Sequence, residues 1–128
     1  MMKGLGILLQ TELTRFKVKV GKTAIVDEWM SLLNEHMEET LLTLENEKMF
    51  VETIFREQLN GEEFLYWYSI QREGGISVDD SESWIDKKHL EYWDECIDST
   101  YKPIDLATEV VMIPEKIRSK YEIKMNLD

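Results

Sequence analysis

Apolar and polar residues follow two different periods along the chain, and each period predicts one type of element. In the run LTRFKVKV, residues 13–20, they alternate one by one, which is typical of a strand with one wet face. After Gly21 the apolar residues recur at steps of three and four, which predicts a long helix from Thr23 to about Leu44. The expected buried stripe of this helix consists of Ile25, Val26, Trp29, Leu32, Leu33, His36, Met37, Leu41 and Leu44.

The period of two returns in residues 48–56 and in the aromatic run EEFLYWYSIQ, residues 62–71. Between them lies Asn60-Gly61, a dipeptide that accepts the positive φ of a tight turn, so we expect an antiparallel hairpin. On the first of these strands, the side that we expect to face the helices consists of Met49, Val51, Thr53 and Phe55. The side that we expect to face away consists of Phe50, Glu52, Ile54 and Arg56.

A second helix and a last strand complete the pattern. Ser77 or Ser83 can cap the helix, since each is followed three residues later by an aspartate. The apolar stripe of this helix is predicted to contain Ile85, His89, Tyr92, Trp93, Cys96 and Ile97. A last strand is expected from Ile104 to Ile113, bounded by Pro114. Residues 115–128 are charged, and we expect one short helix or no regular structure there.

The order β-α-β-β-α-β predicts an α+β fold of the ferredoxin-like type, in which a four-stranded antiparallel sheet carries two helices on one face. We expect the uncovered face of the sheet to mix charged residues such as Arg15 and Glu52 with apolar ones such as Ile54. A half-apolar face favours a second copy of the chain, so we expect a homodimer through the open sheet face, a dimeric α+β barrel. We divide the chain into a flexible N-terminal extension (1–11), the barrel domain (12–114) and a charged C-terminal tail (115–128).

Composition narrows the possible partners. A chain of 128 residues is long enough for one domain with its own core. Its 26 acidic and 15 basic residues give a net charge of -11, which argues against nucleic acid and membrane surfaces as partners. No stretch approaches the roughly 20 apolar residues that a transmembrane helix needs. A single cysteine cannot form an internal disulfide, which favours a cytoplasmic location.

Three segments of the chain resemble an uncharacterised bacterial family of small proteins: MFVETIFRE (residues 49–57), FLYWY (64–68) and DKKHLEYWDEC (86–96). The similarity extends from Phe16 to about Ile113, and Glu52, Arg56 and the spacing of Asp86 and His89 match recurring marks of that family. The family is related to the dimeric α+β barrel superfamily, which includes antibiotic-biosynthesis and heme-degrading monooxygenases, sugar mutarotases and stress-response barrels. The resemblance implies this fold but no particular activity, because one fold hosts many chemistries.

A barrel cavity lined by charged and aromatic side chains would suit a small polar or aromatic molecule. Glu52 is the candidate general base, since desolvation would raise its pKa, while Arg56 would lower that pKa and orient the ligand. The alternative is a structural ion pair inside the dimer. Further candidates for contact with the ligand are Tyr66, Arg15 and Trp93.

His89 is the second candidate catalytic residue, because imidazole titrates near neutrality and can act as a general acid or base. The alternative is a helix histidine that packs against the sheet with one ring nitrogen hydrogen-bonded. Seven helical residues, roughly 10 Å, separate it from Cys96, so we expect that thiol to be a small buried hydrophobe instead of a partner. His36 and Glu39 alone are too few ligands for a metal site, and no phosphate-binding motif is present. We therefore expect neither metal nor cofactor.

Two functional hypotheses follow. In the first, a small cytoplasmic homodimer binds a small polar or aromatic molecule in the barrel cavity and performs acid–base chemistry of an isomerase or monooxygenase type. In the second, the dimer is a non-catalytic structural or interaction module without a ligand cavity. Glu52→Gln separates the two, because it would abolish a ligand response in the first case and weaken the dimer in the second.

Overall fold

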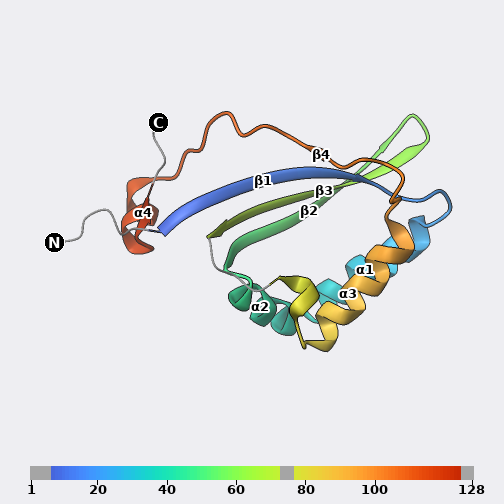
Figure 1. Ribbon diagram of the computed structural model, residues 1–128, viewed down its shortest axis with the longest axis horizontal. Helices are drawn as coiled ribbons and strands as arrows, with labels where there is room; N and C mark the ends of the chain where they lie inside the picture. Colours follow the sequence, from blue (N-terminus) through green and yellow to red (C-terminus); the bar gives the residue numbers. More distant parts are fainter. Residues whose placement is uncertain (1–6, 73–76, 125–128) are drawn as a thin grey trace.

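The computed structural model describes residues 7–72 and 77–124, in which strands and helices alternate along the chain (Figure 1). The elements are β1 (Ile7–Lys17), α1 (Thr23–Glu35), α2 (Met37–Asn46), β2 (Met49–Leu59), β3 (Glu62–Arg72), the short 3-10 helix η1 (Val78–Asp80), α3 (Trp84–Cys96), β4 (Ile104–Asp105), α4 (Glu115–Lys120) and β5 (Ile123–Lys124). The first six residues of the predicted extension and the last four of the predicted tail lie outside the described residues.

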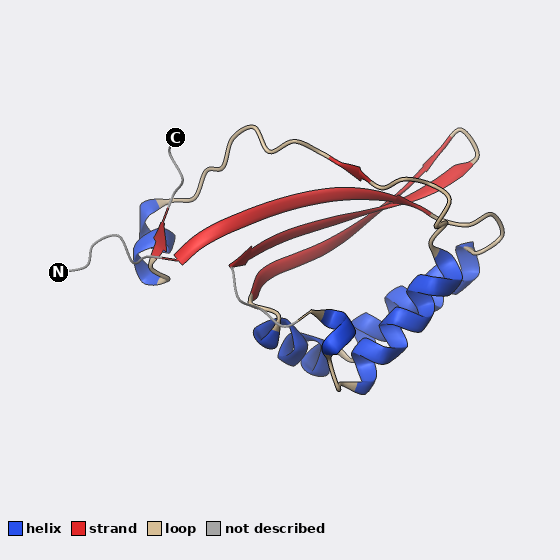
Figure 2. Ribbon diagram, in the orientation of Figure 1, coloured by secondary structure: helices blue, strands red, loops and turns tan. Residues whose placement is uncertain are grey.

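The sheet has the strand order β2-β3-β1-β4, and each of these neighbouring pairs is antiparallel. The short strand β5 pairs in parallel with the start of β1. Helices α1, α2 and α3 lie on one face of the sheet, whereas α4 lies beyond one end of it (Figure 2). An α+β fold built on a four-stranded antiparallel sheet is therefore confirmed.

The hairpin between β2 and β3 forms at the predicted turn. Asn60 and Gly61 both have positive φ, 53° and 78°, and Leu59 pairs with Glu62 on either side of them. A tight two-residue turn of this kind fixes the register of the two strands. On its other edge β3 pairs with β1, so it lies between β2 and β1.

The predicted helix from Thr23 to Leu44 is two helices, because the chain leaves helical geometry at His36, with φ -111° and ψ 39°. The hydroxyl of Thr40 donates hydrogen bonds to two backbone carbonyls across this break, at Leu33 (3.4 Å) and His36 (2.9 Å). Threonine hydroxyls that bond preceding carbonyls bend helices. The apolar stripe is therefore divided between α1, which carries the core, and α2, which extends over the start of β2.

Both terminal strands differ from the prediction. β1 begins at Ile7 and ends at Lys17, so it includes residues 7–11 of the predicted extension. The last strand was expected over Ile104–Ile113, but only Ile104–Asp105 pair with β1. Leu106 and Thr108 still bond β1, at Leu13 and Thr11, beyond which the chain bends away from the sheet toward α4, and β5 pairs with the start of β1 (Figure 1). In this segment Val110 and Met112 are 70% and 84% exposed. α4 is the short helix that was one alternative for the tail.

Beyond an irregularity in strand pairing between Met49 and Val51, the predicted faces of β2 are reversed. Ile54 packs against the buried core, and the guanidinium of Arg56 bonds the Thr23 carbonyl of α1 at 2.9 Å. Alternation then places Glu52 on the same helix-facing side. Val51 and Phe55 face away from the helices and are 41% and 54% exposed.

The reason for this reversal is that both sides of β2 carry apolar residues, so alternation alone does not say which side is inside. Polar groups are tolerated on the inner side when they are paired. Glu52 accepts a hydrogen bond from the indole of Trp67, and Arg56 forms ion pairs with Asp27 and Glu63. On β1 the predicted faces are confirmed for Phe16, which packs against the core, whereas Val20 lies beyond the end of the strand and is 97% exposed.

The core lies between β3, the end of β1, α1 and α3. Trp29, Leu65 and Cys96 are fully buried in it, which confirms Cys96 as a small buried hydrophobe. Burying one large apolar side chain stabilises a fold by about 1.5–3 kcal/mol. This cluster anchors one end of the helical layer to the sheet and so positions the residues described next.

Candidate functional site

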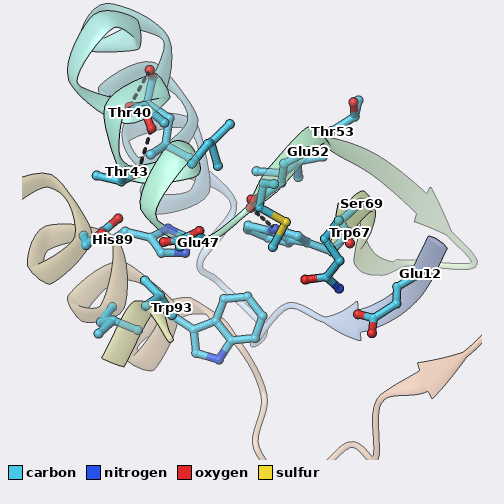
Figure 3. A pocket seen from close by; sticks show the side chains of 18 of the residues that line it. Glu12, Thr40, Thr43, Glu47, Glu52, Thr53, Trp67, Ser69, His89 and Trp93 are labelled. Atoms are coloured by element: carbon cyan, nitrogen blue, oxygen red, sulfur yellow. Dashed lines mark hydrogen bonds between the residues drawn. The ribbon is translucent and has the colours of Figure 1, made fainter. Parts of the chain in front are cut away.

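A pocket of about 1200 Å³ lies between the sheet and the three helices, and we call it the helix–sheet pocket. Its walls come from one face of β1, β2 and β3 and from the facing sides of α1, α2, η1 and α3. Figure 3 shows Glu52, Trp67, Ser69 and Glu12 on the sheet side and Glu47, His89 and Trp93 on the side of the helices. The cavity is therefore inside one chain, on the covered face of the sheet.

Aromatic rings form the inner end of the pocket. Trp67 of β3 lies 5.2 Å from Trp93 and 5.7 Å from His89, both of α3, between ring centroids. The indole of Trp29 in α1 lies behind them, 5.6 Å from Trp67. Ring centroids about 4.5–7 Å apart are typical of favourable aromatic contacts. The inner wall is therefore a continuous aromatic surface.

Glu52 sits on this wall and is held by one indole. The Nε1–H of Trp67 donates a hydrogen bond of 2.6 Å to its Oε1. Burial raises the pKa of Glu52 above its ordinary value, and the negative charge of Asp86 raises it further, while the bond from Trp67 acts in the opposite direction. The second oxygen of this carboxyl group is the one that remains for a ligand or a proton.

His89 is also held by an indole. The Nε1–H of Trp29 donates to Nδ1 of His89 at 2.9 Å, so Nδ1 carries no proton and the neutral ring carries its proton on Nε2. Burial lowers the pKa of His89, although the nearby charge of Asp86 opposes this effect. His89 therefore combines features of both predictions made for it. Its Nδ1 is hydrogen-bonded inside the fold, and its ring lines the pocket.

Two further acidic residues complete the site. Glu47 follows α2, and burial, with the charges of Asp86 and Glu52, raises its pKa to about 7. Asp86 of α3 is 6% exposed, and its Oδ2 has no hydrogen-bond partner among the described residues. A buried polar atom without a partner costs about 1–3 kcal/mol, and more when it is charged. The charges of the three carboxyl groups therefore disfavour one another.

Three predicted site residues lie elsewhere. Arg56 is held by Asp27 and Glu63 at the α1 end of the sheet. Tyr66 and Arg15 are on the outer face: Tyr66 donates to Glu57 at 2.7 Å, and Arg15 donates to the hydroxyl of Tyr101 at 2.9 Å. Of the six residues proposed from the sequence, the structure brings together only Glu52, His89 and Trp93.

Sequence reasoning missed Glu47 and Asp86 as site residues. Asp86 was interpreted as part of a helix cap, but Ser83 makes no side-chain capping bond. Its position one turn before His89, on the buried stripe, is the signal that could have identified it. Glu47 gave no such signal, because it ends a run of acidic residues that otherwise face solvent.

The described residues contain no group of three or more His, Cys, Asp or Glu side chains arranged to hold a metal ion. Nδ1 of His36 lies 3.5 Å from the carboxylate of Glu39, and no third described residue joins them as a metal ligand. The donors present are carboxylates, an imidazole and indole N–H groups. They can exchange protons and orient a small molecule.

None of the described helices combines the length and apolar character required to cross a membrane.

Comparisons with known proteins identify the family but no activity. No curated protein matches the chain. The profile of a family of unknown function, DUF6176, matches residues 9–119, which include β2, β3, β4, all but the first two residues of β1, and all residues of the site. The chain therefore belongs to the DUF6176 family.

Proposed function

We propose that this protein binds a small polar or aromatic molecule in the helix–sheet pocket, and that the pocket moves a proton to or from that molecule. The observation that carries the proposal is the presence, in one cavity, of a carboxyl group with raised pKa and a neutral imidazole. Each is oriented by an indole donor, at 2.6 Å for Glu52 and 2.9 Å for His89. Groups fixed in this way need no reorganisation when the ligand arrives.

Each group has a distinct role in this proposal. Glu52 accepts a proton on the oxygen that Trp67 leaves unbonded, and His89 donates a hydrogen bond from Nε2. Glu47, with a pKa of about 7, is partly protonated at neutral pH and can serve as either donor or acceptor. This set supports acid–base chemistry of an isomerase type.

We also propose that the protein is a homodimer of ferredoxin-like protomers. The homodimer is supported by apolar side chains on the outer sheet face, where Val51 and Phe55 are half exposed. The ferredoxin-like relation is supported by β3 lying between β1 and β2, as in a split βαβ unit, although β4 is short and β5 is additional. A cytoplasmic location rests on the single cysteine.

A non-catalytic interaction dimer is the second candidate, and the same outer face favours it. The outer face and the helix–sheet pocket are on opposite sides of the sheet, so the two functions can be tested separately. Because Glu52 faces the helices, we no longer expect Glu52→Gln to weaken a dimer.

The test of the first proposal is an NMR screen with small aromatic acids, alcohols, amides and amines. The indole N–H signals of Trp67 and Trp29 report directly on Glu52 and His89. We expect at least one chemical class to shift both signals in a saturable way, and Glu52→Gln to weaken that binding by about tenfold or more.

The matched control is Glu57→Gln, which removes a carboxylate from the outer face of the same strand. It should leave the binding unchanged. If no class shifts the indole signals, or if Glu57→Gln and Glu52→Gln behave alike, the pocket is not the binding site and the interaction dimer is favoured.

A further inference from the structure

The helix–sheet pocket is strongly acidic, and this property deepens the proposed function by indicating the class of ligand. Two of its described lining residues are basic types, Arg72 and His89, and Trp29 holds His89 in a neutral form. The acidic lining residues are Glu12, Glu47, Glu52, Asp79, Asp86 and Asp94. An anionic ligand would face this excess of negative charge at close range.

Asp86 provides a second and independent indication. Its side chain is more than nine-tenths buried and lines the pocket, yet no described residue bonds its Oδ2. Buried carboxylate oxygens in folded proteins almost always have a donor. A donor that enters with the ligand would complete this group.

The electrostatic effects of the buried carboxyl groups on one another also favour a ligand that carries positive charge. Asp86 and Glu52 both act electrostatically on Glu47, and Asp86 also acts on Glu52, so the three carboxyl groups share one region of the pocket. They come from α3, β2 and the α2–β2 connection. A positive charge placed among them would relieve their mutual repulsion.

A bare metal ion does not fit this arrangement. No three of the described carboxylates, histidines or cysteine converge as metal ligands do. The cavity of about 1200 Å³ is also far larger than one ion, and Trp67 and Trp93 form an apolar wall beside the acids. Such a combination of acids and aromatic faces is suited to an organic cation.

We infer that the ligand is an organic cation, a protonated amine attached to a flat apolar body. The ammonium group donates to Asp86 Oδ2 and lies beside Glu47 and Glu52. The apolar body packs against Trp67 and Trp93. This inference rests on the proposed function, because it names the ligand of the same pocket.

The experiment uses three probes with one ring and different charges: 2-phenylethylamine, 2-phenylethanol and 3-phenylpropionate. Each is titrated into the full chain at neutral pH while the indole N–H signals are recorded. We expect the amine to bind about tenfold or more tightly than the alcohol, and the anion not to bind. Asp86→Asn should reduce the affinity for the amine to that of the alcohol, because it removes the charge and keeps the shape.

The matched control is Asp80→Asn, an exposed aspartate of η1 that does not line the pocket, and it should bind the amine as the wild type does. Equal or tighter binding of the alcohol or the anion to the wild type would overturn the inference while the proposed pocket stands. Unchanged amine affinity in Asp86→Asn, or no shift with any probe, would also overturn it. If Asp86→Asn does not fold, the ranking of the three probes on the wild type decides.

Discussion

Replacing Glu47 by Gln should make the protein more stable at alkaline pH and leave its stability at acid pH unchanged. The reason is that Glu47 is held among other acids, and its pKa is raised from 4.5 to about 7. The folded protein therefore keeps this proton up to about pH 7, whereas the unfolded chain releases it near 4.5. The stabilisation from the protonated form is complete below pH 4.5 and is lost as the pH rises through 7.

The magnitude follows from the same values. At 1.36 kcal/mol for each pKa unit, the difference between 4.5 and about 7 corresponds to roughly 3 kcal/mol. Glu47 is only half-buried, so water screens much of this energy, and we expect about 1.5 kcal/mol. In Glu47→Gln the side chain carries no charge at any pH. The mutant should therefore exceed the wild type by about 1.5 kcal/mol near pH 8 and match it near pH 4.5.

The assay is urea unfolding followed by tryptophan fluorescence, with the free energy of unfolding compared between mutant and wild type at each pH. Groups that do not interact with Glu47 cancel in this difference, whereas Glu52 and Asp86, whose charges act on Glu47, contribute to the gain near pH 8. Glu45→Gln is the matched control, because Glu45 is exposed and does not line the pocket. A mutant that gains the same stability at both pH values, or loses stability near pH 8, would refute the burial of Glu47 among acids.

Two further predictions test the outer face and the aromatic cluster. Phe55→Asp should convert a dimer into a monomer in sedimentation experiments. The control Leu42→Asp, on the exposed side of α2, should leave the dimer intact. A monomeric wild type would contradict the proposed homodimer. Trp29→Phe should destabilise the protein by roughly 1–3 kcal/mol, because it leaves Nδ1 of His89 without its donor and shrinks a fully buried side chain. The control is the same change at the half-exposed Trp84, which should have a small effect. Nitrogen NMR should then show both tautomers of His89 in Trp29→Phe, and a single Nε2–H tautomer there would contradict the assigned bond.

The hydrophobic periodicity of the sequence was sufficient to predict those elements whose geometry depends on residues only a few positions apart. The Asn60-Gly61 hairpin and the α3 stripe are examples, because turn residues and apolar spacing act within a few positions. The long predicted helix failed at His36, where the backbone leaves helical geometry and the Thr40 hydroxyl bonds carbonyls across the break. The last strand was predicted too long, because the chain leaves β1 beyond Thr108 and the first residues of β1 pair with β5 instead, a nonlocal partner that periodicity does not reveal.

The candidate site could be predicted only in part. Glu52, His89 and Trp93 were identified, because carboxylates, imidazoles and aromatics on regular elements are recognisable by type. The sequence could not show that these three residues lie in one pocket, because a strand with apolar residues on both sides does not reveal its inner face. Asp86 was not predicted as a site residue, because its spacing to His89 indicated only the family and a capping pattern accounted for the aspartate, although Ser83 does not form that cap.

The reversal of β2 supports a functional role for the pocket. With the opposite orientation, Val51 and Phe55 would be buried and Glu52 would be hydrated, an arrangement that hydrophobic burial alone would favour. The folded chain instead places Glu52 beside Glu47 and Asp86, where their charges oppose one another and Asp86 Oδ2 has no partner among the described residues. Violations of this kind persist where a site requires them, because the rest of the core offsets the cost. A bound cation would offset the repulsion among these carboxyl groups, and a second copy of the chain would cover the apolar side chains that this orientation leaves outside.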